Sequence, residues 1–356
     1  QPFTPFIYDD LKTIADHRHY LGATPHGGNA RSDAAGGGHA HAGLMCYLGG
    51  SWPAEFTGKL IIGNIHGQRL NTDVPVRAGS GYVGKHAPDF INFNDRWSQT
   101  LNQLYDQDGS MYVIDWYDKN QCHHNNFDGH DRSNGRIFKI VYNNQAASRV
   151  NLAGLGDDNL AGLAGSRNEW LSRHARRLLQ ERAERIGPDA VERLRHLAFH
   201  GSETPARLRG LWALHLTGHF SHEDAVRLLD DPDEYVRGWV IQLKAEKAQE
   251  ILAAGGSEKA SKAIDRLARM AREDRSPLVR RFLASATQRI PPAQRWSILT
   301  GLASHAEDAT DHNLPLLYWY ATEGAVAEDP GRGLDLLRTA RIPKLRELIA
   351  RRIAQA

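Results

Sequence analysis

The sequence predicts a β domain followed by an α-helical repeat domain. Residues 1–143 hold 18 of the 33 glycines and 10 of the 18 histidines, and turn-forming residues dominate them. Residues 144–356 carry 27 arginines and are rich in residues that favour helices. We therefore expect a β domain over 1–143, a linker over 144–165 and HEAT-like helical repeats over 166–356.

Four short segments rich in β-branched or aromatic residues predict strands, and Gly, Asn, Asp or Pro bound each of them. The segments are 43–48, 59–65, 111–117 and 136–142. Long polar loops over 22–38 and 118–135 separate some of these strands. Loops of that length in a compact domain are usually functional, so we expect binding residues in them.

The helical part opens with a segment, 167–186, whose apolar residues recur at helical spacing. These residues are Trp170, Leu171, Ala175, Leu178, Leu179 and Ala183. Pro188 follows at a position that is typical of the first turn of a helix. The spacing predicts one amphipathic helix and the start of a second.

Three later segments resemble one another, and they begin at Thr204, Asp233 and Ser276. Each starts with a residue that can cap a helix, followed by an apolar–Arg pair and an apolar face. The arginines of these pairs are Arg209, Arg237 and Arg280, with Arg176 a looser match. A single helix pair cannot bury its own apolar face, so the pattern predicts stacked HEAT-like pairs. We interpret the abundance of arginine in this part mainly as a solvated face with helix-cap contacts.

Composition excludes several classes of protein. A net charge of +2 gives no support for a nucleic-acid partner. No apolar run reaches the roughly 18 residues that a membrane helix needs. The sequence contains no CxxCH motif, so it attaches no c-type haem, and two cysteines are too few for a disulfide scaffold.

Five motifs between residues 3 and 143 together carry a resemblance. They are GGGHAHAGLM (36–45), SWPAEFTGKLIIGNIHGQRLN (51–71), GSGYVGKHAPDF (79–90), DQDGSMYVIDWYDKNQCHH (106–124) and DRSNGRIFKI (131–140). Their order and wording resemble the PVC-type membrane-bound dehydrogenase-like proteins. In that family a sugar-dehydrogenase-type β-propeller precedes HEAT repeats, and a cytochrome c module often follows. The resemblance implies that residues 1–143 are a partial propeller, namely its C-terminal blades.

The resemblance also implies an activity and a location. The protein would be extracytoplasmic, in the periplasm or at the cell surface, and would oxidise a sugar or polyol. Electrons would pass to a quinone, such as pyrroloquinoline quinone with calcium, or to haem on a module or partner outside this sequence. The alternative is a non-catalytic scaffold that binds a glycan or protein, with the helical repeats as the protein-docking surface. A metal-dependent hydrolase built on His39 and His41 is a third hypothesis.

His39 and His41 are two residues apart, so on a strand they would face the same side. Such a pair could bind a metal or supply a general base, and the resemblance favours a catalytic role. The alternative is a hydrogen-bonded polar pair along the propeller axis. His66 and Arg69 follow an apolar strand, and Arg69 could hold a carboxylate or quinone oxygen through its planar fork. Arg69 could equally tie a loop to backbone carbonyls.

Asp115 and Trp116 end the clearest strand and point to opposite faces. Asp115 could pair with a sugar hydroxyl or a histidine as a catalytic residue, with Trp116 binding substrate, or Asp115 could fix the turn through a hydrogen bond within its blade. A group of polar and metal-binding residue types follows in the loop after this strand. It comprises Cys122, His123, His124, His130, Asp131 and Arg132. We assign His123, His124 and Asp131 as candidate metal ligands and Arg132 as a candidate binding residue. The alternative is a loop held by side-chain hydrogen bonds.

Overall fold

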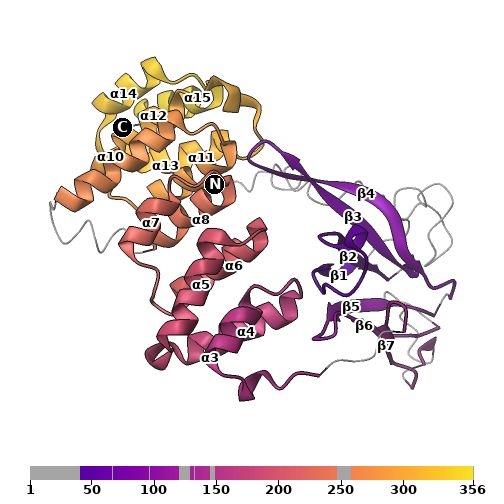
Figure 1. The fold of residues 1–356 in the computed structure, drawn as a ribbon. Coiled ribbons are helices and arrows are strands. Elements are labelled where there is room, and N and C mark those ends of the chain that lie inside the picture. Colours follow the sequence, from indigo (N-terminus) through magenta and orange to yellow (C-terminus); the bar gives the residue numbers. More distant parts are fainter. Residues whose placement is uncertain are drawn as a thin grey trace. The chain divides into compact units, whose positions relative to one another are not determined.

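The computed structural model describes residues 41–65, 67–95, 97–119, 129–131, 133–144, 149–246 and 258–355. The chain divides into two compact units. The first comprises 1–76 and 82–193, and the second comprises 77–81 and 194–356. Figure 1 traces the strands in indigo to purple and the helices in magenta to yellow.

Seven strands form two antiparallel sheets in the described residues, and strands that follow one another along the chain are neighbours. Sheet A consists of β1 (His41–Cys46), β2 (Leu60–Asn64), β3 (Arg69–Ala78) and β4 (Gly81–Asn92). Sheet B consists of β5 (Thr100–Tyr105), β6 (Met111–Asp115) and β7 (Arg136–Ile140). Each of the four predicted strands overlaps a strand of the structure, whereas β3, β4 and β5 were not predicted from the sequence.

One hydrophobic cluster joins the two sheets. It contains Met45, Ile61 and Leu70 from sheet A and Tyr105, Met111 and Val113 from sheet B, together with Tyr47 and Trp52. The Gln103 side chain crosses the same interface, and its Nε2 donates to the carbonyls of Gly43 at 2.5 Å and Ile61 at 2.7 Å. The sheets therefore pack through side chains and through a buried amide that spans both of them.

Two helices complete the first unit, and a third begins in it. They are α3 (Asp157–Ala164), α4 (Glu169–Glu181) and α5 (Pro188–His200). Asn168 caps α4 by accepting from the amides of Trp170 and Leu171, as its short polar side chain favours. Its Nδ2 donates to the carbonyl of Gln107 at 3.0 Å, which fixes the start of α4 on the turn between β5 and β6. The prediction that a helix starts at Pro188 is confirmed.

The second unit is an array of helices packed in pairs, such as α8 with α11, α10 with α12 and α13 with α15. Its helices after α5 are α6 (Thr204–Leu216), α7 (His222–Leu228), α8 (Glu234–Ala245), α10 (Glu258–Glu273), α11 (Pro277–Thr287), α12 (Trp296–Ala303), α13 (Leu314–Glu328), α14 (Pro330–Thr339) and α15 (Pro343–Ile353). The expected order of strands followed by paired helices is thus confirmed. None of the helices in the described ranges has the length and apolar character that crossing a membrane requires.

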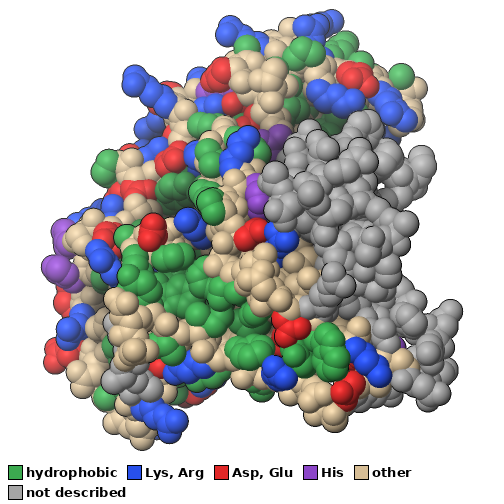
Figure 2. Space-filling model, turned by 90° about the vertical axis from the view of Figure 1, so that its right-hand side faces the viewer, with side chains coloured by type: hydrophobic (Ala, Val, Ile, Leu, Met, Phe, Trp, Pro, Cys, Tyr) green, Lys and Arg blue, Asp and Glu red, His purple; other side chains and the backbone are tan. Residues whose placement is uncertain are grey.

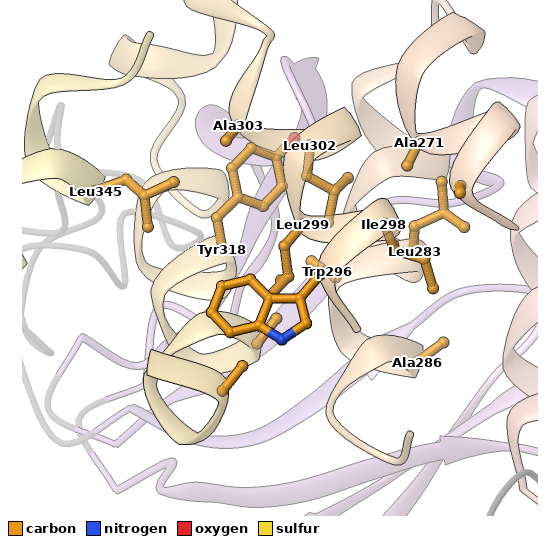
Figure 3. Close-up of a cluster of buried hydrophobic side chains, with 14 of the residues drawn as sticks. Ala271, Leu283, Ala286, Trp296, Ile298, Leu299, Leu302, Ala303, Tyr318 and Leu345 are labelled. Atoms are coloured by element: carbon orange, nitrogen blue, oxygen red, sulfur yellow. The ribbon is translucent and has the colours of Figure 1, made fainter. Parts of the chain in front are cut away.

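The core of the helical array is continuous across several helices. Figure 3 shows the indole of Trp296 and the ring of Tyr318 among small and aliphatic side chains, including Leu283, Leu299 and Leu345. These side chains come from α11, α12, α13 and α15, so each helix pair buries its apolar face against the next pair.

A ladder of ion pairs runs alongside this core. Each rung joins an arginine of one helix to an aspartate in the loop before a later helix, and the rungs are Arg207–Asp231, Arg237–Asp274 and Arg280–Asp308. Each of these arginines lies four residues after the N-cap of its helix.

The ladder corrects one interpretation of the sequence. In α6 the rung is made by Arg207 and not by Arg209, because the N-cap is Glu203 and not Thr204. Arg176, Arg209, Arg280 and Arg295 are buried, whereas many other arginines of the helical part are exposed, as expected of a solvated face. Elsewhere acidic and basic side chains lie interspersed on the surface in view in Figure 2.

Candidate functional site

The face of sheet A opposite the shared core carries a set of polar side chains. We call this set the polar cluster, and it comprises Asn64, Arg69, Asn71, Asp73, His86 and Asp89. On β3, residues 69, 71 and 73 share a face because side chains alternate along a strand. Asn64 lies directly opposite Arg69 in the register of β2 and β3, which extends the polar face across two strands.

A chain of hydrogen bonds connects the cluster. The Arg69 guanidinium donates through Nη1 to Asp89 Oδ2 at 2.9 Å, and Asn71 Nδ2 donates to Asp89 Oδ1 at 2.7 Å. Asn64 Nδ2 in turn donates to Asn71 Oδ1 at 2.8 Å. Asn64 and Asn71 are fully buried, so these hydrogen bonds satisfy groups that would otherwise be costly to remove from water.

The cluster also contains a histidine–carboxylate pair. His86 Nδ1 lies 3.2 Å from Asp73 Oδ1, and its Nε2 lies 3.8 Å from Asp89 Oδ1. The Asp73 side chain is fully buried, whereas the His86 side chain is 21% exposed. With the proton on Nδ1 and directed at Asp73, Nε2 carries the lone pair that can accept a proton. This is the arrangement in which a carboxylate orients an imidazole and stabilises its protonated form.

The connection between β6 and β7 carries a second histidine–aspartate pair. His130 Nδ1 lies 3.1 Å from Oδ2 of Asp118, whose side chain is fully buried, and the amide of Asp131 donates to Asp118 Oδ1 at 3.0 Å. In both pairs a buried aspartate binds Nδ1 of a histidine that lies 12 or 13 residues later in the chain.

Tyr117, at the end of β6, is held in an unusual conformation. Its φ is 47°, which places a residue with a Cβ in the left-handed region. Its hydroxyl donates to Asp95 at 2.9 Å, and the guanidinium of Arg136 lies 3.5 Å from the centre of its ring. The hydrogen bond to Asp95 raises the pKa of Tyr117 above its usual value.

Both carboxylate oxygens of Asp115 accept hydrogen bonds from nearby residues. Oδ2 accepts from Ser98 Oγ at 2.8 Å, and Oδ1 accepts from the amides of Gln99 at 2.6 Å and Tyr117 at 2.9 Å. These hydrogen bonds join the loop before β5 to the end of β6. Trp116 points to the opposite face of sheet B, where about half of its surface is exposed.

The structure brings two of the residues singled out from the sequence into one place. Arg69 is part of the polar cluster, and His41 lies directly opposite Asn64 at the start of β1, so it borders the cluster. Asp115 ends β6, Trp116 follows it, and Asp131 lies in the connection between β6 and β7. The amide of Asp131 binds Asp118, and hydrogen bonds from Ser133 lower its carboxyl pKa. His39, His66, His123, His124 and Arg132 lie outside the described residues.

Only Arg69 of this cluster was predicted from the sequence. The other five members, Asn64, Asn71, Asp73, His86 and Asp89, were not predicted. The alternation of Arg69, Asn71 and Asp73 was the available signal, since period-two spacing of polar residues indicates a polar strand face. His86 and Asp89 stand in GSGYVGKHAPDF, one of the motifs that carry the resemblance.

Calcium and a quinone are the cofactors that the resemblance implies, and the described residues do not provide a cage for calcium. Calcium binds six to eight oxygen ligands. No group of three or more His, Cys, Asp or Glu side chains in the described ranges could hold a metal ion. Arg69, the predicted quinone ligand, is paired with Asp89. The chemistry assigned to these residues is therefore limited to the hydroxyl proton of a substrate.

Comparison with known proteins gives a match over part of the chain, to a family model with no assigned activity. No curated protein matches this chain. Residues 11–144 match the model of a domain of unknown function, DUF7133.

Proposed function

We propose that this chain is part of an extracytoplasmic, dehydrogenase-like propeller–HEAT protein. The protein would oxidise a sugar or polyol and pass the electrons to a quinone or haem partner. The observation that carries the proposal is the His86–Asp73 pair in the polar cluster, because oxidation of an alcohol requires a base for the hydroxyl proton. The order and wording of the motifs supply the substrate class and the location.

Sheet B supports the propeller part of the proposal. In a propeller every blade packs against a neighbour on both faces, and sheet A already covers one face of sheet B. The other face is apolar and exposed, and its exposed side chains include Leu104, Ile114, Trp116 and Ile137. A further β-sheet packed on this face would bury them.

The chemistry assigned to the polar cluster is limited to the proton. His86 Nε2 would accept the hydroxyl proton of the substrate, and the carboxylate of Asp73 would stabilise the imidazolium that forms. Arg69 and Asn71 would keep Asp89 oriented beside the ring through their hydrogen bonds. Oxidation also breaks the C–H bond of the same carbon, and that hydrogen would leave with both electrons as hydride to a quinone outside the described residues, which a haem partner could then reoxidise.

The test compares the two histidine–carboxylate pairs in the full-length protein. His86→Ala should lower sugar- or polyol-dependent reduction of an artificial acceptor by about 10²–10⁴-fold, the usual contribution of a general base. His130→Ala removes the similar pair in the connection between β6 and β7 and should leave most of the activity. Assays with and without added pyrroloquinoline quinone and calcium show whether the activity depends on this cofactor. Equal losses in both variants, tracking a loss of folded protein, would assign both pairs to structure.

A binding scaffold is the second candidate, and one observation favours it. The hydrogen bonds that Asp115, the catalytic candidate in sheet B, accepts come from residues beside it in the fold, and a histidine–aspartate pair recurs after β6. These contacts can serve structure alone, and a fold does not imply an activity, so the chain would then bind a glycan or protein without turnover. Glycan-array binding by wild-type protein that is inactive with every sugar and acceptor would select this candidate.

A further inference from the structure

Besides residues 194–356, the second unit includes one short segment from the strand region of the chain, Arg77–Gly81. We call this segment the strap. The strap contacts Glu234 and Tyr235 at the start of α8 and Asp311 just before α13. Glu234 also binds Ser276, the N-cap of α11. These contacts consist of hydrogen bonds to charged side chains, which are about twice as strong as neutral ones.

Ser80 is the centre of the contact with α13. It is fully buried, its amide donates to Asp311 Oδ2 at 2.7 Å, and its Oγ donates to Asp311 Oδ1 at 2.7 Å. Asn313 Nδ2 donates to Ser80 Oγ at 3.1 Å. Asp311 Oδ1 also accepts from the amides of Asn313 and Leu314. One carboxylate thus satisfies the free amides at the start of α13 and holds Ser80 at the same time.

The glycines on both sides of Ser80 are required by the closeness of the fit. Gly79 has a φ of +52°, and a Cβ there would lie 2.2 Å from Asp311 Oδ2. A Cβ at Gly81 would lie 2.8 Å from both Asn313 Nδ2 and His312 Nε2. The backbone can approach Asp311 only because both neighbours of Ser80 lack a side chain.

Arg77 makes the second contact of the strap. Its Nη1 donates to the Tyr235 hydroxyl at 3.1 Å, and its Nη2 lies 3.4 Å from the Glu234 carboxylate. Glu234 also accepts a hydrogen bond from the hydroxyl of Ser276, the N-cap of α11. The Arg77 guanidinium is therefore linked to α8 directly and to α11 through Glu234.

We propose that the starts of α8, α11 and α13 form a recognition site for a turn of sequence Arg-x-Gly-Ser-Gly, and that the strap occupies this site to hold the three helix ends together. The five residues of the strap are linked to the starts of three helices. Two of the five are glycines without room for a side chain, and a third is the buried Ser80. The strap thus acts as a cross-brace of the helical array, and its loss loosens helix ends that Ser80 itself does not touch.

Amide hydrogen exchange of the full chain, read by mass spectrometry, tests the strap with Ser80→Ala. The hydrogen bonds that cap α13 do not involve Ser80, so a purely local role would change exchange only in 77–81. The strap predicts about tenfold faster exchange in the first turns of both α8 and α13. Arg77→Met should reproduce this effect from the other end of the strap.

Ser297→Ala is the matched control, because Ser297 is an exposed serine near the start of α12. It should leave exchange in α8 and α13 unchanged. The Ser80→Ala and Arg77→Met effects should also fail to add in the double variant, because each releases the same brace. Unchanged exchange in the first turn of α8 in Ser80→Ala, or additive effects in the double variant, would overturn the proposal.

Discussion

Removal of the Asp308 carboxylate should destabilise the helical array more than any exposed charge does. Arg280 is only 2% exposed, and it donates to Asp308 through Nε at 2.7 Å and Nη2 at 2.5 Å. Tyr318 donates to the same carboxylate at 2.6 Å. In Asp308→Ala the buried guanidinium loses both of its hydrogen bonds to this carboxylate, and its remaining carboxylate partner is the exposed Glu307, at 3.7 Å. Removing one partner of a buried pair costs about 3–5 kcal/mol.

The control is the exposed pair Arg338–Asp335 in the same unit, whose side chains are 68% and 73% exposed. An exposed ion pair contributes about 0–1 kcal/mol, so Asp335→Ala should change the free energy of unfolding by no more than that. Both variants can be measured by urea unfolding, with circular dichroism as the signal for helices.

The expected difference in stability between the two variants is also large enough to be measured by thermal unfolding. At about 2–4 °C per kcal/mol for a domain of 150–250 residues, Asp308→Ala should lower the melting temperature by roughly 6–20 °C. Equal costs for Asp308→Ala and Asp335→Ala would refute the reasoning, because burial of the rung would then have no energetic consequence. The pKa of Arg280 agrees with this pairing. Burial would lower the pKa of Arg280, but its hydrogen bonds to Asp308 raise it overall.

Three further predictions follow from single contacts. Gly238→Ala places a Cβ 2.4 Å from the ring of Phe282, so thermal melting should show destabilisation although alanine favours helix more than glycine. Burial alone would raise the pKa of Asp311, but its hydrogen bonds lower it below the usual 3.8. Its stabilisation is therefore present above about pH 4 and is lost as pH falls through the lowered value, and acid titrations of Asp311→Asn should lack this component. Ile137→Lys, at a side chain 71% exposed on sheet B, should reduce self-association in sedimentation, whereas Val226→Lys on α7 should not; no difference between the two variants would argue against a packing surface on sheet B.

The strands that sequence reasoning found are short and apolar, and those that it missed are polar. Residues 111–115 alternate between the shared core and the outer face, which is the pattern that predicts a strand. β3 instead carries Arg69, Asn71 and Asp73 on one face and contains a proline, and such residues argue against a strand when burial is unknown. Their hydrogen bonds to β2 and β4 make them compatible with a buried face, and that pairing is not visible in the sequence.

The candidate site was predictable only in part, for a related reason. Arg69 stood out because it follows an apolar segment, but its partner Asp89 lies 20 residues away on another strand. The rungs of the helical ladder show the same limit. Arg237 and Arg280 were recognised from local pattern, whereas Arg207 was missed because its role depends on where the N-cap falls and on Asp231. Local pattern thus identifies elements, and long-range hydrogen bonds decide which of their polar residues meet.

The most direct test of the proposed function is substrate-dependent reduction of an artificial electron acceptor by the full-length wild-type protein, measured over a panel of sugars and polyols with and without pyrroloquinoline quinone and calcium. The proposal predicts acceptor reduction that saturates with at least one sugar or polyol and that His86→Ala abolishes while His130→Ala retains it. Absence of reduction with every substrate in the folded protein, together with glycan or protein binding, would contradict the proposal and identify the chain as a scaffold.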